Sequence, residues 1–400
     1  MTLRNQDLSK HHFLFSTRLF KFLSNQRPNR NSSDQLLFCS VIVIYSSIFI
    51  FQMLYQLFTT KLIGLSTIKL VQRVSSIIIF ICTYVITYIH YGTIKLLIVR
   101  FKIDHEKISD LDELNVLEKY TAQSKYYVYG LMVFFDVNCL LIISPSIFNA
   151  LLYSIGKLED NQLTLPLIEN NIGHVGILYY SLLIGQSIAF LIAILVGSFA
   201  LSTFLVFIQH ACCQCSIIKL KIRQPFERNK KSVQYNRYFS TQTEENNWIS
   251  EIVNYHRISI EYVKMLRNIS NVIYLIIILF SMIILVFNFL CILQFSVLLK
   301  TLHDKIECII YITGSIFTVY INFYLGQRLL NHSNAVLEEL SNVPFYTLSI
   351  NTQKLLLFMI ARSGKPCFLS IGNMFVSSHE VYAGMMRKAL SFAMVYRSVP

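Results

Sequence analysis

The sequence predicts an all-α membrane protein with seven transmembrane helices, a cytoplasmic N-terminus, an extracellular C-terminus and a cytoplasmic helical anchor region. Three observations predict this fold class. The 400 residues are 54% hydrophobic and only 14% charged, which is typical of a polytopic membrane domain and not of a soluble one. Seven apolar stretches reach the ~17–25 residues that cross ~30 Å of hydrocarbon. The basic residues between them lie mostly on one side.

The seven predicted spans differ in length, and the sixth is only just long enough to cross. The arm before the first span carries six Lys and Arg and no uninterrupted apolar core of a signal peptide, so we expect the first span to be the insertion signal itself. In chain order the predicted spans are Leu36–Phe58, Val74–Leu97, Tyr127–Tyr153, Val175–Ile208, Asn271–Leu298, Cys308–Tyr324 and Ser370–Tyr396.

The orientation follows from the distribution of Lys and Arg. The N-terminal arm and the second, fourth and sixth connections hold 25 of them, whereas the first, third and fifth connections hold 6. Because cytoplasmic loops carry the excess of basic residues, the N-terminus is predicted to lie inside. This topology is the reverse of that of a G-protein-coupled receptor. The net charge of +13 gathers beside the anionic inner leaflet, which predicts membrane lipid as a partner and no nucleic acid.

The predicted organisation is a cytoplasmic N-terminal arm, residues 1–35, followed by one seven-helix transmembrane domain, residues 36–400. The long cytoplasmic loop 209–270 has a basic centre, and its two ends have helical periodicity that extends the neighbouring spans. Residues 351–362 are apolar but too few to cross a membrane, so we expect a short cytoplasmic helix that ends before Gly364.

The predicted last helix, residues 376–398, has an unusual composition for a membrane span. It carries His379, Glu380, Arg387 and Lys388. Charges at membrane depth are costly and usually face protein or water. One polar face on this helix indicates a pore lining or a subunit interface.

Asp136 lies inside the third predicted span, nearer the end that is predicted to be cytoplasmic. An intramembrane carboxylate is a candidate functional group. The interpretation that we favour is an internal pairing with Lys95 or His90 that fixes the helix register.

The motifs in the sequence do not predict an enzyme. No metal cluster, phosphate loop or nucleophile motif occurs in the sequence, so no cofactor and no metal site are expected. The cluster Cys212, Cys213 and Cys215 is compatible with palmitoylation, with a metal site or with plain packing. We favour packing, because no paired His or Cys ligands stand nearby. An extracellular disulfide is not expected, because most of the nine cysteines lie in spans or inside.

A series of short motifs in the last ~75 residues resembles the insect odorant receptor family. The family usually has Trp-Tyr, Thr-Phe, Lys and Ser-Tyr where this chain has Phe345, Val381, Arg387 and Phe392, and each change keeps the size or charge class. The motifs, in order, are Tyr324-Leu325-Gly326-Gln327, Pro344-Phe345-Tyr346, Leu355-Leu356-Leu357-Phe358-Met359, Pro366 with Gly372, Val381-Tyr382, Arg387 and Ser391-Phe392.

The resemblance implies an odorant receptor subunit that binds small volatile hydrophobic ligands. It would open a non-selective cation pore in a heterotetramer with a co-receptor subunit, in the plasma membrane of an olfactory sensory neuron dendrite. The helix at 351–362 would lie where subunits meet, and the last helix would line the pore. Matching the chain's ending to that of the co-receptor places the apolar constriction at Val395 and a polar ring at Ser398. A gustatory-type ligand-gated channel and a metabotropic seven-helix receptor are the alternatives.

The family's ligand pocket lies in the outer half of the membrane, among the second, third, fourth and sixth spans. Such a pocket needs a mostly hydrophobic lining with one or two polar groups. The alternative for each aromatic residue is a place in the interfacial belt or in packing. The residues that these outer halves offer as ligand-binding candidates are Phe80, Tyr84, Ser144, Phe148, Tyr179, Tyr180, Gln186, Tyr311 and Thr313.

The charge asymmetry makes a prediction about topology. An epitope tag before Met1 should bind antibody only after the cells are permeabilised, whereas a tag after Pro400 should bind antibody on intact cells. Immunofluorescence of the two tagged proteins measures this directly. Staining of the N-terminal tag on intact cells would contradict the predicted orientation and favour the metabotropic alternative.

Overall fold

The computed structural model describes residues 32–59, 65–108, 110–159, 163–167, 176–228, 238–293 and 302–398. The protein is helical over most of these residues, which confirms the all-α prediction. The helices are α2 (Ser32–Thr59), α3 (Leu65–Ile89), α4 (Tyr91–Lys107), α5 (Leu111–Ser154), α6 (Ile177–Arg228), α7 (Gln242–Leu293), α9 (Leu302–Ser341), the 3-10 turn η3 (Phe345–Thr347), α10 (Ile350–Ser363) and α11 (His379–Ser398).

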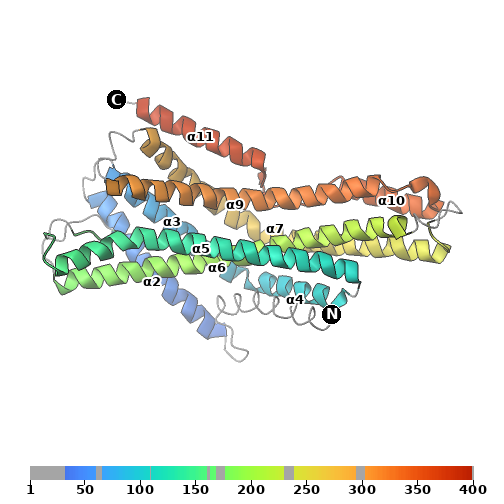
Figure 1. Ribbon diagram of the computed structural model, residues 1–400, viewed down its shortest axis with the longest axis horizontal. Helices are drawn as coiled ribbons and strands as arrows, with labels where there is room; N and C mark the ends of the chain where they lie inside the picture. Colours follow the sequence, from blue (N-terminus) through green and yellow to red (C-terminus); the bar gives the residue numbers. More distant parts are fainter. Residues whose placement is uncertain are drawn as a thin grey trace.

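Helix α6 is the centre of the bundle. Four long helices, α5, α6, α7 and α9, run lengthwise through the molecule (Figure 1), and α6 packs against the other three and against α3. The most apolar 18-residue stretch of α6 is 72% buried inside the protein, whereas the corresponding stretch of α2 is only 17% buried. Helix α10 follows the far end of α9, and α11 returns along α7 and α9. The arrangement leaves α2 at the periphery.

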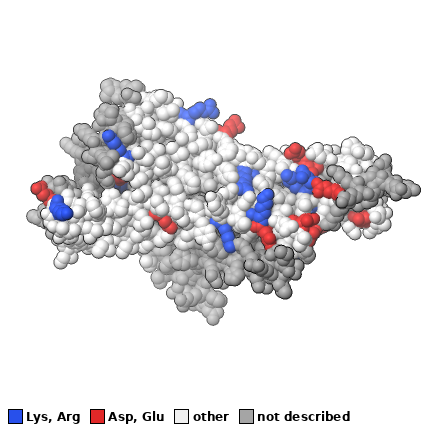
Figure 2. Space-filling model, in the orientation of Figure 1, with Lys and Arg blue, Asp and Glu red and all other residues white. Residues whose placement is uncertain are grey.

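Six of the described helices are long and apolar enough to cross a membrane: α2, α3, α5, α6, α7 and α9. Their outward faces carry large apolar side chains such as Phe51 and Phe58 on α2, which are 72% and 83% exposed. On the face shown in Figure 2, most charged side chains lie toward the end that carries α10. The protein is therefore a multi-pass membrane protein. Helix α11 carries too many charges to count among the six, so the seventh span remains a prediction.

The second span begins nine residues earlier than predicted, at Leu65 and not at Val74. Hydropathy assigns Lys69 and Arg73 to a loop, but both side chains are buried in α3 and paired with acidic residues of α9. Lys69 Nζ lies 2.8 Å from Asp304 and 2.7 Å from Glu307, and Arg73 Nη2 lies 2.5 Å from Glu307. Because each charge is paired, it no longer prevents these residues from being buried in the helix bundle. A hydropathy average over neighbouring residues cannot detect this pairing, since the partners are far apart in the sequence.

The last predicted span also begins at a different residue. Residues 370–376 are not helical, because Ser370–Ile371 (β1) pairs antiparallel with Phe375–Val376 (β2). Gly372 and Asn373 between the strands have φ values of +57° and +58°, which favour Gly and Asn. The backbone N–H of Gly372 donates to the carbonyl of Asn271 on α7 at 3.1 Å. The hairpin therefore anchors the chain on α7 before α11 starts at His379.

Two residues of the motif at 324–327 position α11. A Cβ on Gly326 would lie 2.5 Å from the carbonyl oxygen of Ser377, so only glycine allows α9 and the start of α11 to approach this closely. Gln327 Oε1 accepts a hydrogen bond from the backbone N–H of His379 at 3.1 Å. This bond satisfies one of the free N–H groups at the beginning of α11.

The predicted cytoplasmic extensions are confirmed as continuous helices. Helix α6 runs to Arg228, α7 begins at Gln242 and α9 continues to Ser341. The short helix predicted at 351–362 is α10, Ile350–Ser363. Trp248, the single tryptophan, is buried in this region beside Ile249 and Ile252. The end of the bundle that is predicted to be cytoplasmic therefore has a core of its own.

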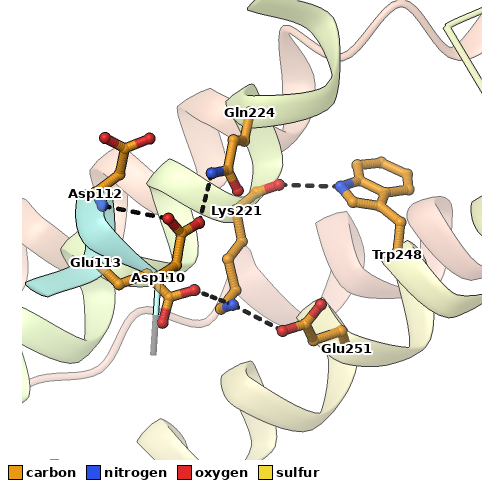
Figure 3. A network of polar contacts seen from close by, with 7 residues as sticks. All are labelled: Asp110, Asp112, Glu113, Lys221, Gln224, Trp248 and Glu251. Carbon is orange, nitrogen blue, oxygen red and sulfur yellow. Dashed lines mark hydrogen bonds and ion pairs between the residues drawn. The ribbon is translucent and has the colours of Figure 1, made fainter. Parts of the chain in front are cut away.

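A buried lysine ties α5, α6 and α7 together in this region. Lys221 on α6 pairs with Glu113 on α5 and lies 2.7 Å from Glu251 on α7 (Figure 3). The backbone carbonyl of Lys221 accepts a hydrogen bond from Trp248 Nε1 at 3.0 Å. Gln224 Nε2 donates to Asp110, the cap of α5, at 2.7 Å. Three long helices are thus held in one register by polar contacts around one ammonium group.

A second polar contact joins α4 to α6. Asp104 accepts hydrogen bonds from His210 Nε2 at 3.1 Å and from Gln214 Nε2 at 2.7 Å. Burial alone would raise the pKa of Asp104, but the hydrogen bonds and the charge of His210 outweigh it and lower the pKa. Asp104 is therefore held as a carboxylate at this junction.

The Lys221 contact predicts a stability effect. Lys221→Met should lower the free energy of unfolding by about 3–5 kcal/mol, because it leaves Glu113 buried without its partner. The additional change Glu113→Leu should restore most of this loss. Denaturant unfolding of the detergent-solubilised chain measures both. Arg100→Ala is the matched control, since the pair of Arg100 and Glu261 is 36% and 52% exposed and should contribute at most about 1 kcal/mol. Equal losses for Lys221→Met and Arg100→Ala would contradict the assignment.

Candidate functional site

A cavity of about 80 Å³, partly open to the surface, lies between α3, α5, α6, α7 and α9. This is several times the ~10–15 Å³ that a single water molecule requires. Most of its wall is aliphatic or aromatic, and the polar contributions are hydroxyls and one amide. The lining residues are Ser76, Ile79, Phe80, Phe135, Asn138, Ile142, Phe190, Ile194, Ser281, Ile284, Ile310, Tyr311, Gly314, Ser315 and Thr318.

Two glycines shape the wall. A Cβ on Gly197 of α6 would lie 2.6 Å from Cγ of Phe80, so glycine is what allows the Phe80 ring to lie against α6. The ring then meets Phe135 edge-on, with 5.5 Å between the ring centroids. On the opposite side, a Cβ on Gly314 would lie 3.4 Å from Oδ1 of Asn138. Both glycines bring a side chain from a neighbouring helix into the bundle centre.

A hydrogen-bond chain fixes the polar part of the wall. Gln72 Nε2 donates to Asn288 Oδ1 at 2.7 Å, and Asn288 Nδ2 donates to Ser315 Oγ at 2.5 Å. Thr318 and Ser76 donate to carbonyls of their own helices. These groups are satisfied by the protein, so they hold α3, α7 and α9 together and leave the cavity largely apolar.

Asn138 and Tyr311 are the polar side chains best placed to orient a ligand. Asn138 Nδ2 donates to the carbonyl of Phe134 at 2.7 Å, which leaves its amide oxygen as an acceptor. The Tyr311 hydroxyl is buried near Arg73 and makes no hydrogen bond of good geometry in the described part of the chain. A small molecule with one hydroxyl or carbonyl group would match an apolar cavity with two such groups.

Of the nine predicted ligand-binding residues, Phe80 and Tyr311 line this cavity. Three others are buried elsewhere. Tyr84 packs with Val196 and Phe199. The hydroxyl of Tyr179 donates to the carbonyl of Thr164 at 3.3 Å, and Gln186 accepts from the backbone of Leu167 at 3.2 Å. Both therefore hold the segment 163–167 against α6. The four that lie at the surface, outside the cavity, are Ser144, Phe148, Tyr180 and Thr313.

Sequence reasoning missed the contribution of α7, through Ser281 and Ile284, and most of the aliphatic lining. One signal was available. Asn138, Ser281 and Asn288 are polar residues in otherwise apolar spans, and such residues usually face the bundle interior. The aliphatic residues carry no such signal, because Ile284 in the wall and Ile283 at the surface differ only in helix rotation.

Helix α11 has one buried and one open face. Met385, Ala389 and Ala393 recur every four residues and are buried, so this stripe faces the bundle. Val395, the predicted constriction, is 62% exposed, whereas Ala393 is fully buried. The side chain of Ser398 lies outside the described residues. Val395 therefore lies on the open side of the helix, where a second subunit or an aqueous pore can reach it.

The structure also places the two groups whose role the sequence left open. Asp136 is half-buried, and it forms no ion pair with Lys95 or His90, all three of which are described. Cys212, Cys213 and Cys215 are at most 4% exposed and free of disulfides. Their burial favours the packed cluster over a lipidated one.

Comparison with known proteins identifies related folds. A family model described as 7tm odorant receptor matches residues 64–390. The solved structure of the insect olfactory receptor OR5 from Machilis hrabei is similar to this chain, with a TM-score of 0.74 and 10% sequence identity, and the match covers 100% of this chain and 99% of that one. The structure of the same receptor in complex with eugenol matches over the same shares, with a TM-score of 0.72 and 10% identity. No curated protein matches the sequence significantly.

Proposed function

Since this chain belongs to the insect odorant receptor family, we propose that it is an odorant receptor subunit whose ligand binds in the cavity between α3, α5, α6, α7 and α9. The observation that carries this proposal is the cavity itself. It is lined by five helices, it is mostly apolar, and it has two polar side chains that can orient a ligand. The related OR5 receptor has been solved in complex with eugenol, a small and largely apolar molecule.

The driving force for binding is burial of apolar ligand surface, at roughly 25 cal/mol per Å². Specificity then comes from Asn138 and Tyr311, because a ligand that leaves these groups without a hydrogen bond loses affinity. In this proposal the cavity has no charged lining residue. Ionised ligands are therefore excluded, because the lining offers no charge to pair with theirs. Small neutral volatile molecules are the class of ligand that fits the cavity.

We further propose that ligand binding opens a non-selective cation pore formed with co-receptor subunits in a heterotetramer at the plasma membrane. The open face of α11 supports this proposal. It carries Arg387, Lys388 and Ser391 as exposed side chains, which are unfavourable against lipid and favourable against water. Helix α11 packs on α7 and α9, both of which wall the cavity. A ligand that separates these helices can therefore act on α11 through direct contacts.

The cavity predicts which substitutions change odorant potency. Phe80→Ala and Tyr311→Ala should each raise the half-maximal odorant concentration by roughly 5- to 150-fold, which corresponds to about 1–3 kcal/mol of lost apolar contact. The measurement is the whole-cell current evoked by an odorant panel in cells that express the chain with a co-receptor.

Two matched controls accompany this experiment. Thr313→Ala changes the same helix as Tyr311, and Phe148→Ala removes the same type of side chain as Phe80. Both residues are exposed outside the cavity, so the half-maximal concentration should stay unchanged. Unchanged potency in both cavity variants, at normal surface expression and for every active ligand, would exclude this cavity as the ligand site.

The pore proposal makes a separate prediction. Val395→Ser should widen and wet the constriction, so the resting leak or the ion selectivity should change. The effect should be partial, because co-receptor subunits contribute their own residues to the ring. Ala393→Ser, on the buried face, is the control and should leave both properties unchanged. Recordings from excised patches without GTP or soluble messengers measure these currents. Equal effects at the two positions, or none at Val395, would remove Val395 from the pore.

A further inference from the structure

Two cysteines from different helices meet at one end of the bundle. Cys291 lies near the end of α7 and Cys308 lies near the beginning of α9. They form one buried cluster with Ile68 of α3, and they are 1% and 6% exposed. Both side chains therefore pack into the same buried cluster, although they come from different helices. Both are reduced in the structure.

This contact lies at the end of the membrane region that is predicted to face outside. Cys291 is two residues before Leu293, where α7 ends, and Cys308 follows the start of α9 by less than two turns. Glu307, next to Cys308, belongs to the ion-pair cluster with Lys69 and Arg73. Charged groups gather where hydrocarbon gives way to water, so the thiols lie close to the aqueous boundary. During synthesis this side of the membrane is the oxidising lumen of the endoplasmic reticulum.

We propose that Cys291 and Cys308 form a disulfide that staples α7 to α9 at the outer end of the bundle. One thiolate attacks a protein or small-molecule disulfide, and a thiol of that oxidant leaves. The second thiolate then attacks the mixed disulfide and releases the other thiol. The protein loses two protons and two electrons, and the oxidant is reduced to two thiols. The two cysteines share one buried cluster, so an S–S bond of ~2.05 Å between them would join side chains that are already neighbours.

The other described cysteines differ in place and surroundings. Cys212, Cys213 and Cys215 lie on the part of α6 that is predicted to be cytoplasmic, and Cys367 lies between α10 and β1 on the same predicted side, where thiols stay reduced. Cys82 and Cys139 lie on α3 and α5, away from the cluster of Cys291. Among the described cysteines, Cys291 and Cys308 are therefore the pair that combines a shared buried cluster with the side predicted to be oxidising.

The staple would act on the proposed ligand site. Ile284 on α7 lies two turns from Cys291, and Tyr311 on α9 lies one turn from Cys308, and both line the cavity. A covalent bond at this end limits how far the two walls can separate. The redox state would therefore set the potency of ligands; this part rests on the proposed function, whereas the bond itself does not.

The test counts thiols in the full chain expressed with a co-receptor. Cells are lysed in denaturant with a maleimide polymer that shifts the band once per free thiol, with and without prior reduction. Of the nine cysteines, we expect seven to react before reduction and nine after it. Cys291→Ser and Cys308→Ser should each give eight in both conditions. The matched control Cys82→Ser should keep the difference of two.

Nine reactive thiols in both conditions for the unaltered chain would overturn the proposal. So would a difference of two that persists in Cys291→Ser, because another pair would then be responsible. These counts need no odorant, so they fail or succeed independently of receptor function. In the functional measurement, a membrane-impermeant reductant should shift the half-maximal odorant concentration of the unaltered chain and not that of Cys291→Ser. A shift of equal size in both would exclude the staple as its cause.

Discussion

The ion pairs between α3 and α9 determine the register on which the cavity depends. Arg73 and Lys69 reach across to Glu307 and Asp304 in a region where unpaired charges are unfavourable. Once these pairs form, the two helices cannot slide or rotate independently. Phe80 lies two turns beyond Arg73 on the same face of α3, and Tyr311 lies one turn beyond Glu307 on α9. The ion pairs therefore direct both side chains into the same space. A buried ion pair contributes little net stability, but it specifies one arrangement among many.

The shape of the cavity between these helices depends on glycines that lie opposite larger side chains. Gly197 receives the Phe80 ring and Gly314 receives Asn138. Helix α6 makes this possible, since it is buried on most sides and contacts every other wall of the cavity. The same helix continues to Lys221, where polar contacts fix α5 and α7. One helix thus connects the apolar cavity to the core around Trp248.

The sequence was sufficient for features that depend on local periodicity. The long apolar helices, the helical extensions of α6 and α7, and α10 were predicted as helices. The errors occur where distant residues pair. The sequence places Lys69 and Arg73 in a loop, but in the structure they lie in α3 and pair with Glu307. It also places residues 370–376 in a membrane helix, but they form a hairpin that contacts Asn271 on α7. Phe80 and Tyr311 were identified because they are aromatic, but the chain alone cannot say which side of a helix faces inward. Cys291 and Cys308 meet for the same reason, across a connection between two helices.

The proposed pore accounts for the two unlike faces of α11. Its buried stripe of Met385, Ala389 and Ala393 is small enough to dock closely on α7 and α9. Its opposite face carries Arg387 and Lys388, and each charge costs about 2.5–3.5 kcal/mol at the centre of a bilayer on insertion scales. Hydrocarbon is therefore a poor environment for this face, whereas water is a good one. Several copies of the helix arranged around an aqueous axis remove the penalty without changing the fold of any subunit. The charge that excludes α11 from the apolar spans is thus the property that suits it to line a pore.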